Sequence, residues 1–308
     1  MAQLSESHVH SSSREFDLII FGATGFTGRY VALRLAELEG AQRADGFSWA
    51  VAGRSRSRTQ AVADECAAAH GCPAPAVIEA DVSDATSLAA MAARGRALIN
   101  CVGPYRFYGE QCVRACVEAA TDYFDITGEP EFMERMELSY HAQAEANGCC
   151  IVSACGFDSI PADLGSAFAS QHFGDGRCAN IESFFTFNPD PSLGGKAHYA
   201  TWQSAVEGFG SVSALRNVRR QLARPRVRTV GPRIPRCGLY KYDEGSAPCA
   251  GRFLKRFPAV DPKVNRSAGT TRACAAGRCP SRAQTLRYIR IPAARSLSNP
   301  YSVVDPER

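Results

Sequence analysis

The chain has 308 residues, a formal net charge of +4 at pH 7 and 45% hydrophobic residues, so it is long enough for two domains with hydrophobic cores. It contains no run of 18 apolar residues, which excludes a predicted bilayer-spanning helix. Its 13 cysteines include no C-x-x-C pair, so we expect neither a disulfide framework nor a zinc site, and no other metal site.

An apolar run over residues 16–21 predicts the first strand, and a glycine-rich loop follows it directly. The spacing is G-x-x-G-x-x-G, with one glycine for a sharp turn, one for close approach of a pyrophosphate and one for packing of helix on strand. A helical pattern over residues 26–39 starts there, and its N-terminal N–H groups suit phosphates. The predicted dinucleotide-binding residues of this loop are Gly22, Ala23, Thr24, Gly25, Phe26, Thr27 and Gly28.

The second predicted strand, residues 47–52, ends in a basic segment that runs from Arg54 to Arg58. In a dinucleotide-binding unit this strand end faces the adenosine ribose, where a carboxylate selects NAD and an arginine accommodates the 2′-phosphate of NADP. The segment contains three arginines and no carboxylate. We therefore predict NADP(H) as cofactor, with Arg54 as the main 2′-phosphate contact and Ser55 as a second one. The alternative is a solvated basic loop at the start of a helix.

Strands and helices then alternate along the chain. Further strands are predicted over residues 76–79, 97–102, 123–126 and 149–153, and further helices over residues 58–70, 84–94, 109–120 and 131–147. Five helical crossovers between six apolar strands predict an α/β fold, a doubly wound parallel Rossmann sheet. We expect the strand order 3-2-1-4-5-6, with the ligand at the switch point between strands 1 and 4.

The ends of the third and fourth strands supply further candidate cofactor contacts. Asp81 and Val82 follow the third strand and are expected near the adenine, although Asp81 could instead be the N-cap of the next helix. Cys101, Val102 and Gly103 follow the fourth strand and are expected beside the nicotinamide ribose.

Three side chains are candidate proton donors. Tyr105 and Tyr108 provide the first aromatic hydroxyls after the fourth strand, although such aromatics often only pack in a lid. Asp158 lies in the turn-rich segment after the sixth strand, which is either an ordinary strand–turn–helix or a group of substrate-side residues closing over the nicotinamide.

The segment after the fifth strand contains two carboxylates. Asp125 and Glu129 are expected to face the cleft at the carboxyl edge of the sheet. Pro130 suits the first turn of the following helix, for which Thr127 or Glu129 could be the cap.

Several motifs in one order make the chain recognisable: IIFGATGFTGRYV, VAGRS, NCVGPYRFYGE, YFDITGE and ACGFDSIPADLG. The chain resembles the saccharopine dehydrogenase-like oxidoreductases, which include the mycobacterial trans-acting enoyl reductases, from about Phe16 to about Pro262. The resemblance implies an NADP-binding Rossmann domain followed by a smaller α+β domain that covers the active site. It also implies a role in lipid or glycolipid metabolism and a location at lipid droplets, mitochondria or membranes.

The charge distribution and the end of the resemblance suggest four segments. Residues 1–13 form a polar, disordered N-terminus without features of a secretory signal, residues 14–155 the Rossmann domain, and residues 156–262 an incomplete α+β domain. Residues 263–308 form a basic, disordered tail: residues 224–308 hold 18 Lys and Arg against 5 Asp and Glu, whereas residues 1–223 hold 17 against 26. We interpret the tail as a shifted reading frame or alternative end; a genuine basic tail that binds acidic lipid or nucleic acid is the alternative.

The short-chain reductase mechanism is excluded because none of the four lysines, at positions 196, 241, 255 and 263, lies four residues after a tyrosine. We therefore expect an NADP-dependent oxidoreductase of another kind, acting on a lipid-like enoyl or carbonyl substrate, with no nucleic-acid partner and as a candidate homodimer. The alternative is a non-catalytic module that binds NADP(H) at a lipid surface.

Overall fold

A computed structural model of the chain describes residues 14–41, 46–157, 159–171, 184–185, 199–223, 240–242 and 252–256. The chain divides into two compact units: Met1–Gly156 with Ala197–Arg224, and Phe157–Lys196 with Pro225–Arg308. The predicted N-terminal segment 1–13 and the predicted tail 263–308 lie outside the described residues.

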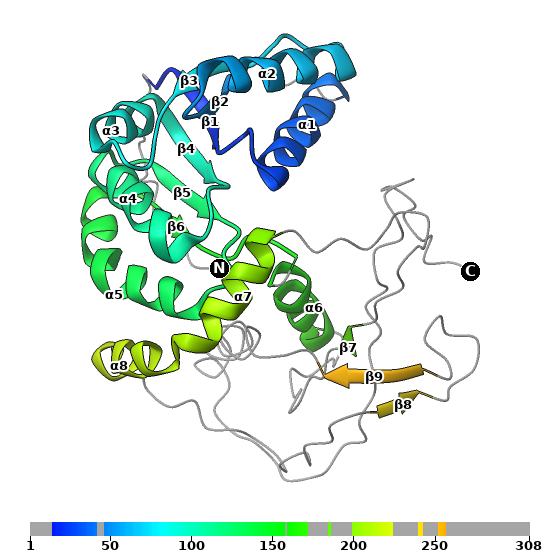
Figure 1. Cartoon of the computed structure of the whole chain (residues 1–308), viewed down its shortest axis with the longest axis vertical. Helices are drawn as coiled ribbons and strands as arrows, with labels where there is room; N and C mark the ends of the chain where they lie inside the picture. The colour runs from blue at the N-terminus through cyan, green and yellow to red at the C-terminus, as the bar shows by residue number, and fades with distance from the viewer. Residues whose placement is uncertain are drawn as a thin grey trace. The chain divides into compact units, whose positions relative to one another are not determined.

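The first unit contains a six-stranded parallel sheet (Figure 1). Its strands are β1 (Phe16–Phe21), β2 (Trp49–Gly53), β3 (Ala76–Glu79), β4 (Gly95–Asn100), β5 (Asp122–Asp125) and β6 (Ile151–Val152). Ile19 of β1 pairs with Ala50 of β2 on one side and Leu98 of β4 on the other. The order β3-β2-β1-β4-β5-β6 confirms the predicted topology and places the switch point between β1 and β4.

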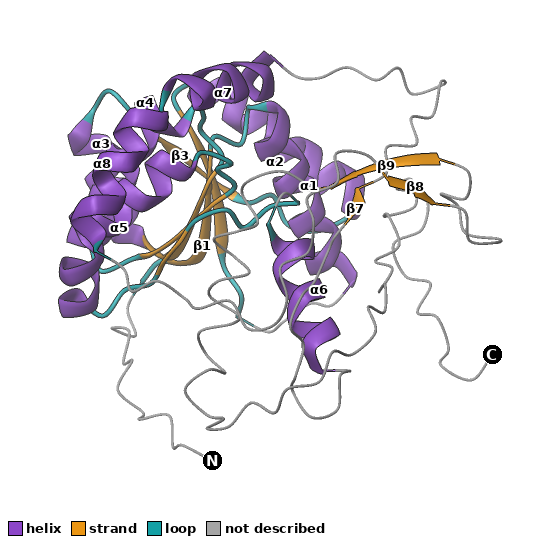
Figure 2. Ribbon diagram, turned by 90° about the horizontal axis from the view of Figure 1, so that it is seen from below, coloured by secondary structure: helices purple, strands orange, loops and turns teal. Residues whose placement is uncertain are grey.

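Helices cover both faces of this sheet, as the edge-on view in Figure 2 shows. The helices α1 (Phe26–Ala41) and α2 (Arg56–His70) lie on one face, and α3 (Ala85–Arg94), α4 (Tyr105–Glu118) and α5 (Pro130–Asn147) lie on the other. Successive side chains of a strand point to opposite faces. Ile20 therefore packs in the core under α1 and α2, whereas Ile19 packs in the core under α3, α4 and α5.

The N-cap of α3 and the start of α4 differ from the sequence-based prediction. The N-cap of α3 is Asp84, whose carboxylate accepts a hydrogen bond from Thr86 N at 2.9 Å, so the N-cap alternative for Asp81 is wrong. Helix α4 begins at Tyr105, four residues before the predicted 109–120, because a carboxylate from a distant loop satisfies its first N–H groups. The loop before it contains a cis peptide bond between Gly103 and Pro104.

The predicted second domain, residues 156–262, is divided between the two units. Helices α7 (Tyr199–Gly210) and α8 (Val212–Leu222) belong to the first unit. There α8 packs on α5, and Arg219 forms an ion pair at 2.9 Å with the buried carboxylate of Glu134. The segment thus returns to the Rossmann domain and adds a further helical layer to it.

The second unit contains both helix and sheet. Helix α6 spans Ile160–Gln171, and three short antiparallel strands lie in the order β7 (Phe184–Phe185), β9 (Arg252–Arg256), β8 (Tyr240–Tyr242). Among the described residues of the whole chain, none of the helices has the length and apolar character needed to cross a membrane.

Candidate functional site

The glycine-rich loop joins β1 to α1 at the switch point of the sheet. Gly22 has a φ of +84°, and a Cβ there would lie 2.7 Å from Val102 Cγ2, so only glycine fits between the β1 and β4 loops. A Cβ on Gly28 would lie 2.1 Å from the carbonyl oxygen of Gly22, which explains the close packing of α1 on the loop. Gly25 is exposed, as a residue that approaches a pyrophosphate must be.

The N-terminus of α1 presents backbone N–H groups beside this loop. A hydrogen bond from Arg29 N to Gly25 O at 3.0 Å closes the first turn of the helix, and the first N–H groups of a helix point out of its N-terminal end. Phe26 and Thr27 are exposed, and no acidic residue lies in the first turn. The loop and the helix end therefore fit the diphosphate of a dinucleotide.

Three exposed arginines lie at the end of β2: Arg54 in the loop, and Arg56 and Arg58 in the first turn of α2. Within the described part of the chain, none of the three forms an ion pair with a carboxylate. Ser55 is the N-cap of α2 but makes no side-chain capping bond. Asp81 lies near this end, and its pKa is lowered mainly by hydrogen bonds from Ser83, with a smaller contribution from Arg54.

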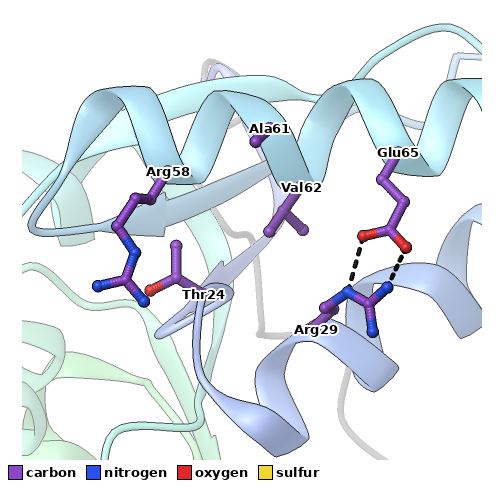
Figure 3. A pocket seen from close by; sticks show the side chains of 6 residues that line it. All are labelled: Thr24, Arg29, Arg58, Ala61, Val62 and Glu65. Carbon is purple, nitrogen blue, oxygen red and sulfur yellow. Dashed lines mark hydrogen bonds and ion pairs between the residues drawn. The ribbon is translucent and has the colours of Figure 1, made fainter.

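A groove of about 280 Å³ runs between the glycine-rich loop and α2 (Figure 3). Its lining residues are Thr24, Arg29, Arg58, Ala61, Val62 and Glu65. Figure 3 shows the Arg58 side chain extending from α2 toward Thr24, and Arg29 bonded to Glu65 at the other end, with Arg29 Nε 2.7 Å from Glu65 Oε2. Arg58 was not among the predicted site residues, because only the packing of α2 on α1 creates the groove.

The end of β4 forms a buried polar network. Asn100 Nδ2 donates to the Tyr123 hydroxyl at 3.1 Å, and Asn100 Oδ1 accepts from Val102 N at 2.9 Å. The Tyr105 hydroxyl donates to Asn100 O at 2.8 Å, and burial raises its pKa well above the ordinary value. Burial also raises the pKa of the Cys101 thiol to about 12. Of the predicted nicotinamide-side residues, 101–103, Cys101 and Val102 adjoin the loop at Gly22.

The three candidate proton donors occupy different environments. Tyr105 is 6% exposed and its hydroxyl is already bonded, so its position suits a structural role rather than proton donation to a substrate. Tyr108 is 42% exposed on the first turn of α4. Asp158 lies outside the described residues.

The carboxylates of Asp125, the last residue of β5, and Glu129, in the loop after it, hold the backbone and do not face an open cleft, so that expectation was wrong. Asp125 is fully buried and accepts from Thr127 N at 3.0 Å and Ala154 N at 2.9 Å, and burial raises its pKa. Glu129 is 2% exposed and accepts from Tyr105 N at 3.1 Å. Asp125 therefore joins the β5 and β6 loops, and Glu129 caps α4.

Neither predicted side chain caps α5 directly. Glu129 is the N-cap residue of α5 but makes no capping bond to it, while the Thr127 hydroxyl accepts from Glu129 N at 3.2 Å. Pro130 occupies the first turn of α5 as predicted. Among the described residues, no group of three or more His, Cys, Asp and Glu side chains could hold a metal ion.

Known proteins are similar to parts of this sequence. Residues 18–152 match the family model of the saccharopine dehydrogenase NADP binding domain. The human saccharopine dehydrogenase-like oxidoreductase is 41% identical over 231 residues, which cover 73% of this chain and 53% of that protein. A lipid droplet localized protein of Caenorhabditis elegans is 37% identical, over 82% of this chain and 59% of its own length.

A protein of Mycobacterium tuberculosis named as a trans-acting enoyl reductase is 44% identical over 162 residues, 53% of this chain and 37% of that protein. The chain thus spans about half the length of the first two relatives and less of the third. NADP(H) is the cofactor of the matched domain, and the glycine-rich loop has the geometry to hold it. Residues 18–152 therefore match a saccharopine dehydrogenase NADP-binding domain, and the chain is similar to saccharopine dehydrogenase-like oxidoreductases over part of their length.

Proposed function

We propose that the chain is an NADP(H)-dependent oxidoreductase that acts on an enoyl or carbonyl group of a lipid-like substrate. The observation that carries the proposal is the glycine-rich loop at the β1–β4 switch point, within a stretch that matches an NADP-binding domain. When bound, NADP(H) supplies or accepts the hydride at nicotinamide C4. The chain's own residues bind and orient the reactants.

Each segment at the carboxyl edge has a distinct role in this proposal. The glycine-rich loop and the first turn of α1 hold the diphosphate, and Arg54 with Ser55 contacts the 2′-phosphate. Asp81 and Val82 border the adenine. Residues 101–103 border the nicotinamide ribose, and the network around Asn100 keeps their backbone in place.

Exposed aromatic side chains support an apolar substrate. Phe26 and Tyr30 on α1 are 58% and 54% exposed, and Phe107 and Tyr108 on α4 are 48% and 42% exposed. Both helices start at the carboxyl edge of the sheet, on either side of the switch point. The name of the nematode relative mentions lipid droplets and that of the mycobacterial relative mentions enoyl reduction, which agrees with such a substrate and with a lipid-droplet location. A mitochondrial or membrane location stays a prediction. Within this proposal Tyr108 and Asp158 are the candidate proton donors.

The experiment is a titration of the purified chain with NADPH and with NADH, followed by nicotinamide fluorescence. We expect selective binding of NADPH that weakens in Arg54→Ala. Turnover of NADPH with a panel of enoyl and keto lipids then tests the reaction. Absence of binding of either nucleotide, in a chain that circular dichroism shows to be folded, would contradict the proposal.

A second function is favoured by one observation, the buried and bonded hydroxyl of Tyr105. Without that proton donor, the chain could serve as a non-catalytic NADP(H)-binding module at a lipid surface. Tight NADPH binding with no turnover over the whole lipid panel would favour the module. A homodimer stays a prediction for either function, and sedimentation equilibrium of the purified chain tests it.

A further inference from the structure

We infer that Tyr123 and Asp125 are positioning residues for the nicotinamide half of the cofactor. Through the side chain of Asn100 they fix the loop after β4, and they hold it in register with the segment after β6. The inference rests on the proposed function, because it needs a dinucleotide whose nicotinamide ribose borders residues 101–103. It assigns a role in cofactor binding to two side chains that are fully buried and out of reach of a ligand.

Asn100 connects the loop after β4 to the neighbouring strand β5. The residue is fully buried and pairs in the sheet with Asp125 of β5. Asn100 Oδ1 accepts from Val102 N at 2.9 Å, so Nδ2 is the end of the amide that donates to the Tyr123 hydroxyl, at 3.1 Å. Exchange of the two ends would place Nδ2 against a backbone N–H, so only one orientation of the amide satisfies both neighbours. The Tyr123 hydroxyl accepts from Asn100 and keeps its own proton for a further acceptor.

Asp125 collects donors from two loops. Its carboxylate accepts from Thr127 N at 3.0 Å in the loop after β5 and from Ala154 N at 2.9 Å in the segment after β6. Burial raises the pKa of this carboxyl, and hydrogen bonds from the two N–H groups and from the Tyr123 hydroxyl oppose that rise. The contacts therefore form one chain from the backbone of Val102 to the backbone of Ala154, through three buried side chains.

The backbone at Ala154 depends on this support. Ala154 has a φ of +62°, in the left-handed region that residues with a side chain avoid. Such a conformation persists only where the surrounding structure fixes it, and it is common at functional sites. Asp125 provides two contacts there, since its carboxylate accepts from Ala154 N and its backbone carbonyl accepts from Cys155 N at 2.6 Å. The same segment leads along the chain to Asp158, a candidate proton donor of the proposed function.

The other end of the chain of contacts meets the glycine-rich loop. A Cβ added to Gly22 would lie 2.7 Å from Val102 Cγ2 and 3.1 Å from the carbonyl carbon of Cys101, so the two loops are in close contact. A shift of Val102 would therefore change the surface that borders the nicotinamide ribose. The adenine half lies elsewhere, because the order of the sheet places β2 and β3 on the far side of β1 from β5 and β6. Loss of the chain of contacts should thus disturb only the nicotinamide half.

The experiment compares the whole cofactor with its adenine half. Isothermal titration calorimetry gives the dissociation constants of NADPH and of 2′,5′-ADP, and the fluorescence of bound NADPH reports the surroundings of the nicotinamide. Tyr123→Phe removes one hydroxyl and keeps the ring, so it should weaken NADPH binding about 3- to 10-fold, the range for one lost hydrogen bond, and lower the fluorescence of bound NADPH. Binding of 2′,5′-ADP should stay within about twofold, because its site is distant. Asp125→Asn, in which an NH₂ group replaces one acceptor, should act in the same direction.

Tyr140→Phe is the matched control. Tyr140 lies on α5, and its hydroxyl also makes a hydrogen bond, to Glu110 Oε1 at 3.2 Å, but it has no part in the chain of contacts. This variant should bind both ligands as the wild type does. Hydrogen exchange provides a measurement without ligand, since the backbone amides of Val102 and Ala154 should exchange faster in Tyr123→Phe than in Tyr140→Phe.

Two results would overturn the inference while leaving the proposed function intact. The first is an equal loss of NADPH and 2′,5′-ADP binding in Tyr123→Phe, which would indicate general destabilisation. The second is unchanged NADPH binding and fluorescence in Tyr123→Phe, whatever its hydrogen exchange. If the folded wild-type chain binds neither NADPH nor 2′,5′-ADP, the proposed function fails, and the inference fails with it.

Discussion

Replacing the buried carboxylate of Glu129 tests how α4 is held at the carboxyl edge of the sheet. Glu129 is 2% exposed and accepts from the first N–H groups of α4, at 3.1 Å from Tyr105 N and 3.3 Å from Arg106 N. It also accepts from Arg106 Nε at 3.0 Å and from the Ser204 hydroxyl at 3.2 Å. One side chain thus caps a helix, forms a buried ion pair and contacts α7.

The expected loss in the free energy of unfolding follows from these contacts. Removing one partner of a buried ion pair costs about 3–5 kcal/mol, because the remaining charge stays buried without compensation. The Arg106 side chain is 13% exposed and would keep only its ion pair with the more exposed carboxylate of Glu207, at 3.3 Å. We expect Glu129→Ala to lower the free energy of unfolding by this amount, and Glu129→Gln, which keeps the acceptor oxygen, to lower it by about 2–3 kcal/mol.

Urea unfolding followed by circular dichroism measures both values. Glu15→Gln is the matched control, since Glu15 also pairs through both oxygens with an arginine, Arg94, but the pair is exposed and should contribute little to stability. Arg106 also donates to Glu207 O of α7 at 3.0 Å, so Arg106 connects Glu129 to this helix. Glu129→Gln should therefore also speed the exchange of backbone amide hydrogens in α7 and in α8, which follows it. A cost no larger than that of Glu15→Gln, with unchanged exchange in these helices, would refute the reasoning.

Three further predictions concern the same region. Gly28→Ala should abolish NADPH binding in a fluorescence titration, because its Cβ would lie 2.1 Å from a carbonyl oxygen of the loop. Gly210→Ala is the control: its Cβ would have no neighbour within 4 Å, so this variant should bind NADPH normally. Equal binding of NADPH by both variants would contradict the prediction. The thiol of Cys101, whose pKa burial raises to about 12, should react with iodoacetamide at pH 8 far more slowly than exposed Cys150 in peptide mass spectra, and comparable rates would count against its burial. Burial raises the pKa of Asp125 in the folded state above its unfolded value, so the folded state binds the proton more tightly and this contribution to stability is lost as pH rises through the folded pKa. The urea midpoint of the wild type, measured relative to that of Asp125→Asn, should therefore fall as pH rises through the acidic range. Midpoints of the two proteins that change with pH in the same way would disprove the raised pKa.

The order of the sheet and the position of the glycine-rich loop could be predicted from the sequence because both depend on local signals. Continuous apolar runs mark strands that are covered on both faces, and helical periodicity marks the crossovers between them. Gly22 and Gly28 could be assigned roles because the steric demand of a turn acts on the residue itself. The arginines after β2 predicted the cofactor type, because an arginine at this strand end accommodates the 2′-phosphate of NADP.

Tertiary packing decided which polar side chains are available to a ligand. Glu129 and Tyr105 are 24 residues apart, and their contact sets the start of α4 and turns a predicted cleft carboxylate into a helix cap. The contact between Arg106 and Glu207 spans 101 residues and ties α7 to the Rossmann domain. Arg58 became a groove residue only through the packing of α2 on α1. Burial and hydrogen-bond partners depend on which distant segments meet, so local sequence patterns could predict the elements but not these pairings.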